Sequence, residues 1–465
     1  MSRKLKHKVL ASILAVCMLT SAMAVTTTAQ TDSTSSTSIV DLTTEYRDQP
    51  IGIDTDAPRF SWKMDSNLIG QEQTAYQVNL YQGEASGQPI WTTGKVKDDS
   101  SVAIQYDGEP LQPKTVYYWT VTIWDRNGET TTSEPTKFET GLGEDANWEK
   151  AAFLCLEKSS SAPIFRTEQT LTGNKIASAR LYITSLGAYQ AYINGKQVGN
   201  VQSDGSMTYN HMSPGYGNTG VSLTYQTYDV TDLIDQSNVA LSVLAGTGWY
   251  GGMGSTTGTP AVKAMLEISY QDGSTQDILT NTTDWKATLD GAITFNSIWD
   301  GETYDANKAV ALGDYTQVGY DDSNWSSCNT SSYDKPIIAS TGEQGSILDE
   351  LEQHPISATV YTGAKEQSSY EGGEINVNNY YAYEKSDDAL YNDGVDVTIV
   401  EKDKEIFDGG ISLKAGQTMV IDLGQNMAAI PNFVFSADQG TTVTMRFAEM
   451  LNDGSKVYSL SLIHI

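Results

Sequence analysis

The chain has 465 residues, which at roughly 100–200 residues per domain predicts about three domains. It carries 29 Lys and Arg against 58 Asp and Glu, a formal net charge of -29, and this acidity repels phosphate backbones and anionic lipids. We therefore expect no nucleic-acid partner and, after removal of the N-terminal segment, no membrane partner. The counts of 40 Gly, 26 Tyr and 9 Trp favour a turn-rich all-β protein, and 39% hydrophobic residues exclude a wholly disordered chain.

The N-terminus has the pattern of a bacterial secretory signal peptide. A basic n-region precedes an apolar run at 9–24, which ends in an A-x-A cleavage pattern. We expect cleavage near Ala24, so residues 1–24 are a signal peptide and the mature protein is secreted. A retained anchor is the alternative, although the run is short for a membrane span. A Thr/Ser-rich linker follows at 25–38.

Residues 39–142 are expected to form an immunoglobulin- or fibronectin-III-like sandwich. Runs of alternating, β-branched and aromatic residues predict short strands, and Asp107-Gly108 and Asn127-Gly128 predict hairpin turns. The size of the segment and the spacing of its strands fit such a sandwich. The main predicted strands cover 60–62, 75–81, 102–104 and 117–124.

Residues 148–335 are expected to form a longer β-sandwich, a jelly roll rather than a second immunoglobulin-like domain. Asn194-Gly195 predicts a hairpin turn between strands at 190–193 and 196–198. In the segment Lys263–Tyr270, one face of a strand is lined by Ala264, Leu266, Ile268 and Tyr270.

Residues 336–458 are expected to form a third domain, a second jelly-roll-type β-sandwich, with strands at 418–421 and 442–447. One short helix is expected at 347–353, and almost no helix elsewhere. A polar stretch at about 366–408 is expected to be an insertion.

The cysteine and histidine residues form no recognised metal-binding pattern. Cys155 and Cys328 remain after cleavage, too far apart in sequence to indicate a disulfide framework, and we expect buried thiols without a disulfide. Pairing of the two in an oxidising exterior is the alternative. The four His show no H-E-x-x-H motif and no Cys/His cluster, so a zinc site is not expected.

A glycine-rich loop at 246–251 is the candidate binding site. Its sequence satisfies G-x-G-x-x-G, but the small residues that follow do not open a helix, which excludes a dinucleotide fingerprint. Trp249 and Tyr250 in this loop are the candidate substrate-binding residues, because aromatic faces stack on sugar rings. The alternative is that Trp249 closes the end of the sandwich.

Asp300, Glu302 and Asp305 form an acidic group that suggests paired-carboxylate chemistry. Carboxylates so close together around Gly301 more often form turns and cap backbone N–H groups, which is the interpretation we favour. Calcium binding by these oxygens is the other alternative, although the spacing is not that of an EF-hand. No catalytic residue is assigned.

An ordered series of short motifs resembles bacterial α-L-rhamnosidases across nearly all of residues 40–458. In the first domain the motifs are Pro50-Ile51-Gly52-Ile53-Asp54, Pro58-Arg59-Phe60-Ser61-Trp62, Gln73-Thr74-Ala75-Tyr76, Tyr118-Trp119 with Trp124-Asp125, and Phe138-Glu139-Thr140-Gly141. In the second they are Ile183-Thr184-Ser185-Leu186-Gly187 to Ile193-Asn194-Gly195, Tyr228-Asp229-Val230-Thr231, Gly248-Trp249-Tyr250, and Asp300-Gly301-Glu302 with Tyr304-Asp305-Ala306. In the third they are Asp422-Leu423-Gly424-Gln425-Asn426-Met427 and Ala448-Glu449-Met450-Leu451.

The resemblance implies a secreted enzyme that hydrolyses terminal α-L-rhamnosyl groups of plant glycosides or polysaccharides with inversion. In that family the catalytic acid and base lie on an (α/α)6 barrel that follows the β-sandwiches, and nothing in this sequence resembles the barrel. We therefore expect a truncated, non-catalytic N-terminal portion that is inactive alone, with residues 459–465 outside the family pattern. One jelly roll in some relatives binds rhamnose with calcium, so 148–335 is the candidate here; no cofactor is required, and calcium is a candidate ligand. The alternative is a non-enzymatic extracellular carbohydrate-binding or adhesion protein.

Overall fold

The structure, a computed structural model, describes residues 37–156, 162–202, 205–215, 219–235, 237–251, 258–298, 301–340, 345–348, 351–362, 398–401, 411–445 and 447. The expected signal peptide and most of the polar stretch at 366–408 lie outside these ranges. The chain divides into two compact units. The first comprises Met1–Pro50, Thr55–Leu111 and Thr115–Phe138, and the second comprises Ile51–Asp54, Gln112–Lys114 and Glu139–Ile465.

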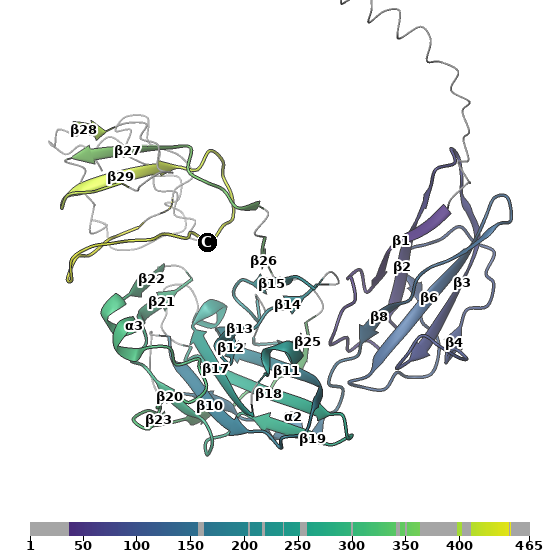
Figure 1. Cartoon of the computed structure of the whole chain (residues 1–465), viewed down its shortest axis with the longest axis horizontal. Coiled ribbons are helices and arrows are strands. Elements are labelled where there is room, and N and C mark those ends of the chain that lie inside the picture. The colour runs from purple at the N-terminus through teal and green to yellow at the C-terminus, as the bar shows by residue number, and fades with distance from the viewer. Residues whose placement is uncertain are drawn as a thin grey trace, which may run out of the picture. The chain divides into compact units, whose positions relative to one another are not determined.

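The first unit is an antiparallel sandwich (Figure 1). Its strands are β1 (Thr37–Thr44), β2 (Arg59–Ser66), β3 (Gln73–Gln82), β4 (Trp91–Thr92), β5 (Ile104–Gln105), β6 (Val116–Asp125), β7 (Thr130–Thr132) and β8 (Thr136–Glu139). One sheet has the order β1-β2-β5 and the other β4-β3-β6-β7, with β8 paired to β6. In β6, Tyr117, Trp119, Val121 and Ile123 are fully buried on one face, as the alternating pattern predicts.

The second unit is built on a larger sandwich of two sheets (Figure 1). The strands of the sandwich are β9 (Phe153–Cys155), β10 (Ile164–Thr170), β11 (Ile176–Leu186), β12 (Ala188–Ile193), β13 (Lys196–Gln197), β16 (Leu223–Asp229), β17 (Asn238–Gly246), β18 (Ala261–Tyr270), β19 (Thr275–Leu279), β20 (Lys286–Thr288), β23 (Ser326–Ser327), β24 (Asn329–Ser331) and β25 (Ile337–Ala339). One sheet runs β13-β12-β17-β10-β20-β23. The other, the β18 sheet, runs β24-β9-β18-β11-β16-β25, with β19 also paired to β18.

The main core lies between these two sheets. It contains Leu181 and Ile183 of β11, Leu241 of β17, and Leu266 and Ile268 of β18, all fully buried. Side chains alternate between the two faces of a strand, so the residues between these core positions point to the outer face of the β18 sheet. That outer face holds two smaller buried clusters, which belong to the same unit.

Short elements complete the second unit. They are β14 (Asn200–Val201), β15 (Met207–Asn210), β21 (Ile293–Ser297), β22 (Gly301–Tyr304), β26 (Ser346–Ile347), the helices α2 (Ala146–Lys150) and α3 (Ala306–Leu312), and the 3-10 turns η1 (Thr231–Leu233) and η2 (Gly248–Gly251). Both α-helices lie outside the one predicted helical segment, 347–353. The prediction is wrong at Ile347, which pairs with Tyr209 of β15 in an antiparallel ladder.

A separate three-stranded sheet, β28-β27-β29, contains β27 (Ser357–Thr362), β28 (Thr398–Glu401) and β29 (Gln417–Asp422). The strand predicted at 418–421 is confirmed as part of β29, which pairs with β27. The strand predicted at 442–447 is wrong for 442–445, where the backbone is irregular and Val443 is 52% exposed. An alternating sequence gains stability as a strand only when a neighbour supplies ladder hydrogen bonds and covers its apolar face.

Cys155 and Cys328 are both buried thiols, and no disulfide joins them. Cys155 packs with Phe153 and Leu186 on the outer face of the β18 sheet. Cys328 instead belongs to the main core between the sheets. Burial raises the pKa of the Cys328 thiol to about 12, which makes it a poor nucleophile near neutral pH.

Candidate functional site

Trp249 and Tyr250, the predicted sugar-binding pair, lie in η2, immediately after β17. We call residues 247–251 the Trp249 turn. The indole of Trp249 is 40% exposed. Tyr250 is half-buried and packs against the outer-face cluster that contains Phe153 and Leu186. Tyr250 therefore has a packing role, while sugar contact through Trp249 and Tyr250 stays a prediction.

Two glycines allow the Trp249 turn to approach the neighbouring strand connection. Gly187 has φ +116, and a Cβ at this position would lie 2.1 Å from the carbonyl oxygen of Gly246. Gly248 has φ +47, and its Cβ would lie 2.9 Å from the backbone nitrogen of Ala188. No side chain fits at either position without movement of the backbone. This close contact between the backbone at 187–188 and at 246–248 determines where the Trp249 turn projects from the sandwich.

Hydrogen bonds join the Trp249 turn to the hairpin of β21 and β22. The backbone N–H of Thr247 donates to Asn296 Oδ1 at 2.9 Å, and Thr247 Oγ1 donates to the Asn296 carbonyl oxygen at 3.3 Å. Asn296 pairs with Glu302 across the hairpin. The structure thus brings the aromatic turn near 249 and the acidic segment near 302 to the same corner of the unit.

The acidic group does not form a catalytic pair in the residues that the structure describes. Asp305 caps the N-terminus of α3, where its carboxylate accepts the backbone N–H of Asn307 at 2.9 Å. This confirms the capping interpretation for Asp305. Glu302 is not in a turn but lies exposed in β22, and Asp300 is outside the described residues.

Within the described ranges, no three His, Cys, Asp or Glu side chains come close enough to hold a metal ion. The calcium binding that the sequence resemblance implies stays a prediction. Across the same part of the chain, none of the helices has the length and apolar character needed to cross a membrane.

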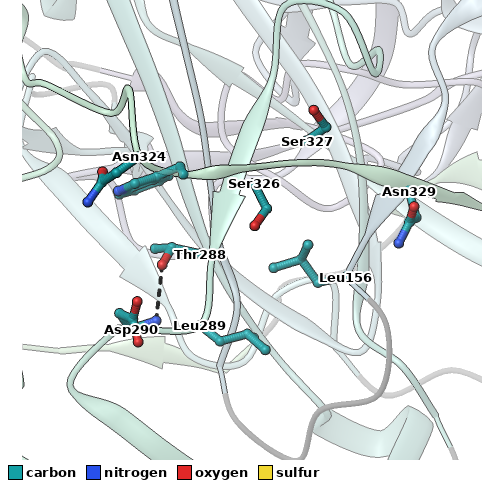
Figure 2. A pocket seen from close by; sticks show the side chains of 9 residues that line it. Leu156, Thr288, Leu289, Asp290, Asn324, Ser326, Ser327 and Asn329 are labelled. Atoms are coloured by element: carbon teal, nitrogen blue, oxygen red, sulfur yellow. Dashed lines mark hydrogen bonds between the residues drawn. The ribbon is translucent and has the colours of Figure 1, made fainter.

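A polar cavity of about 410 Å³ lies at the edge where β20 meets β23. Figure 2 shows its wall, in which the hydroxyl of Thr288 accepts the backbone N–H of Asp290 at 3.1 Å. Asn324, Ser326 and Asn329 supply further polar groups. Asp290 is the only acidic or basic side chain in this lining, so the cavity offers hydrogen bonds and little charge.

A second cavity, of about 460 Å³, lies on the outer face of the β18 sheet, and we call it the Lys263 cavity. Lys263 stands between Val262 and Ala264, two residues of the main core, so its side chain points to the opposite face. That face is covered by Trp148 of α2 and by the segment 331–337. Lys263 is only 6% exposed.

The Lys263 ammonium contacts aromatic rings rather than carboxylates. Its Nζ atom lies 4.7 Å from the ring centre of Trp148 and 5.9 Å from that of Phe153. Among the described residues, no hydrogen bond or ion pair is made by the Lys263 ammonium. Desolvation by burial lowers the pKa of Lys263, and the negative charge of Glu149 opposes this effect.

A hydrogen-bonded carboxylate forms another part of the cavity wall. The hydroxyl of Tyr225 donates to Asp54, with 2.9 Å to each carboxylate oxygen, and the backbone N–H of Ala339 donates to the same carboxylate at 3.1 Å. The Tyr225 hydroxyl in turn accepts the backbone N–H of Leu142 at 2.9 Å. Asp54 is thus fixed by two donors, and burial together with its charge raises the pKa of Tyr225.

Three family profiles match this chain in order. Residues 39–144 match the "Rha78A-like, N-terminal immunoglobulin domain", and residues 174–350 match the "Alpha-L-rhamnosidase N-terminal domain". Residues 413–464 match the "Bacterial alpha-L-rhamnosidase concanavalin-like domain". The chain belongs to the α-L-rhamnosidase family. The third match extends to residue 464, so it includes most of the segment 459–465 that was expected to lie outside the family pattern.

The relatives of this chain are longer proteins. An α-L-rhamnosidase of Formosa agariphila is 30% identical over 318 residues, which cover 60% of this chain and 32% of the relative. The crystal structure of Streptomyces avermitilis α-L-rhamnosidase, complexed with L-rhamnose, aligns with a TM-score of 0.60 at 20% identity over 78% of this chain and 54% of that one. The structure of the Dictyoglomus thermophilum enzyme aligns with a TM-score of 0.58 at 25% identity, over 83% of this chain and 45% of the other. The chain thus spans about half or less of each relative and carries the N-terminal portion of the family's architecture.

Sequence reasoning missed Lys263 in this rhamnosidase-family chain. The alternation in Lys263–Tyr270 places its side chain on the face opposite the apolar stripe, where a lysine is expected to be solvated. One signal is present in the sequence, since Trp148, Tyr333 and Ile337 are large aromatic or aliphatic residues that can cover a sheet face. The residues next to Lys263 in sequence do not indicate which face of the sheet these side chains cover.

Proposed function

We propose that this chain is the non-catalytic, sugar-binding N-terminal portion of a secreted α-L-rhamnosidase, which hydrolyses terminal α-L-rhamnosyl groups of plant glycosides or polysaccharides. The order of the three matched domains supports the assignment, as does the name of the relatives. Secretion rests on the signal-peptide pattern at 1–24.

The exposed indole of Trp249 carries the binding part of this proposal. A tryptophan that is 40% exposed at a turn offers an apolar ring face to the C–H groups of a sugar ring. Asn296 and Glu302 lie at the same corner and supply hydrogen-bonding groups for sugar hydroxyls. L-Rhamnose is the ligand named for the Streptomyces avermitilis structure, and we propose the same sugar here, with calcium as an accessory ligand.

The proposal assigns no catalytic residue to the described part of the chain. An inverting glycosidase holds an acid and a base roughly 6.5–9.5 Å apart on opposite sides of the sugar. Asp305 is engaged in capping α3, and Glu302 is exposed on a two-stranded hairpin. Neither residue lines one of the two cavities. We therefore place the acid and base on a part of the protein outside these residues.

Binding is tested by titrating the chain with L-rhamnose, once with calcium and once with a chelator. Trp249→Ala should weaken binding by roughly 5- to 30-fold, since one stacked ring contributes about 1–2 kcal/mol, and should leave the thermal midpoint nearly unchanged. Tyr46→Ala is the matched control, because Tyr46 is also an exposed aromatic residue, 57% exposed, but lies in the first unit. Undetectable rhamnose binding by the unmodified chain under both conditions refutes the binding role.

Activity is tested with an aryl α-L-rhamnoside. We expect no release of the aryl group by this chain, and release by a form extended through the coding sequence that follows residue 465. Turnover by the chain alone that disappears in Glu302→Gln would place the active site at the hairpin and overturn the proposal. An extended form that binds rhamnose without hydrolysis would favour the binding or adhesion protein instead.

A further inference from the structure

The Lys263 cavity is lined by a lysine that has little exposed surface and whose charge is not balanced by a direct partner. Lys263 as a whole residue is 6% exposed, and among the residues described here its ammonium has no hydrogen-bond or ion-pair partner. Burying an ammonium group is unfavourable unless an anion or several acceptors compensate. The rings of Trp148 and Phe153, at 4.7 and 5.9 Å, compensate only in part.

The other charged groups of the wall are already engaged or lie further off. Asp54 accepts hydrogen bonds from Tyr225 and Ala339. Lys335 pairs with Asp334 at 3.2 Å. Glu149 acts on Lys263 only through its charge, without a contact. Lys263 is therefore the cation in this wall that can accept a new anionic partner.

The remaining lining is suited to a sugar ring. The half-buried ring of Tyr333 presents aromatic surface, the edges of Trp148 and Phe153 continue this wall, and Ser331 and Ser332 present hydroxyl groups. The volume of about 460 Å³ lies within the range of small-molecule sites. Asp54 and Glu149 in the same wall disfavour a doubly charged phosphate, so a singly charged carboxylate is the anion that fits best.

We propose that the Lys263 cavity binds a sugar that carries a carboxylate, with the carboxylate at Lys263 Nζ and the ring against the aromatic wall. The choice of a sugar rests on the proposed function and the aromatic lining, whereas the choice of a carboxylate rests on Lys263 and the two acidic residues of the wall. The cavity and the Trp249 turn use different residues, so the two sites are separable by mutation.

The test is calorimetric titration of the full chain with sodium D-galacturonate, its methyl ester, D-galactose and sodium acetate. We expect galacturonate to bind at least tenfold more tightly than the methyl ester, galactose or acetate. Lys263→Met should weaken galacturonate binding at least tenfold, and Lys263→Gln provides a polar second variant should the first fold poorly. Lys95→Met is the matched control, since Lys95 also lies over an indole, 3.9 Å from the ring centre of Trp124, but does not line the cavity.

Several results overturn the proposal. Equal affinity for galacturonate and its methyl ester would show that the carboxylate is not recognised. Equal affinity for galacturonate and acetate would show that the sugar ring is not recognised. Unchanged galacturonate binding in both Lys263 variants would show that Lys263 does not hold the ligand. Trp249→Ala should weaken rhamnose binding and leave galacturonate binding unchanged. Lys263→Met should weaken galacturonate binding and leave rhamnose binding unchanged. Failure of the proposed carboxylate site is therefore distinguishable from failure of the proposed function.

Discussion

Replacing Tyr225 with phenylalanine should destabilise the second unit by about 2–3 kcal/mol, because it removes one buried hydroxyl with two roles. This hydroxyl donates to the Asp54 carboxylate and accepts the N–H of Leu142. A hydrogen bond to a charged group contributes roughly 1.5–3 kcal/mol, and a buried N–H left unpaired costs roughly 1–3 kcal/mol. Asp54 keeps the donor from Ala339, and both Asp54 and Tyr225 line a cavity that admits water. The loss therefore falls well below the sum of the two contributions.

Tyr182 provides a matched control in the same buried cluster, with its ring centre 6.4 Å from that of Tyr225. Its hydroxyl is buried without a hydrogen-bond partner in the described part of the chain. Tyr182→Phe removes an unsatisfied polar group, so stability should stay unchanged or rise by about 1 kcal/mol. Both substitutions remove a tyrosine hydroxyl oxygen from the same cluster, and they differ in whether that hydroxyl has hydrogen-bond partners.

The assay is urea denaturation of the full chain, followed by tryptophan fluorescence. With a slope of roughly 2 kcal/mol per molar urea, Tyr225→Phe should lower the midpoint of the second unit by about 1 M. The first unit has its own buried tryptophans, Trp62 and Trp119, and its transition should not move. Equal shifts for Tyr225→Phe and Tyr182→Phe would show that the hydroxyl partners do not determine stability here, which would refute the reasoning.

Three further substitutions test other parts of the second unit. Gly187→Ala should lower the thermal midpoint and alter Trp249 fluorescence, because its Cβ would lie 2.1 Å from a backbone oxygen at φ +116. Asp145→Ala should lower the free energy of unfolding by about 1–2 kcal/mol, since the Asp145 carboxylate caps α2 by accepting the N–H of Trp148 at 3.0 Å. An unchanged urea midpoint of the second unit would contradict this. Burial lowers the pKa of Lys263 below 10.5, so between the folded and unfolded pKa values the unfolded chain holds more protons and stability rises with pH. The Lys263→Met variant should therefore have a higher free energy of unfolding than the unmodified chain at pH 7, and this difference should shrink as the pH approaches 10.5. A difference that does not depend on pH would exclude the lysine charge as its cause.

Features that depend on neighbours in sequence were predictable. The Asn194-Gly195 turn is confirmed, with φ +50 and +83 and Ile193 paired to Lys196 across it. The alternation along 117–124 identifies the buried face of β6, because successive side chains of a strand point to opposite faces. The ordered motifs also identify the family, since the three domain profiles match in the same order and each overlaps motifs of its domain.

The two candidate sites were decided by contacts between distant segments. Thr247 and Asn296 are 49 residues apart, and only their hydrogen bonds bring the Trp249 turn to the hairpin of Glu302. Alternation places Lys263 correctly on the face away from the main core, but a pattern of period two cannot say whether that face meets water. The face is covered because α2 and the segment 331–337 pack over the β18 sheet, and burial of a charge is a property of everything that surrounds it.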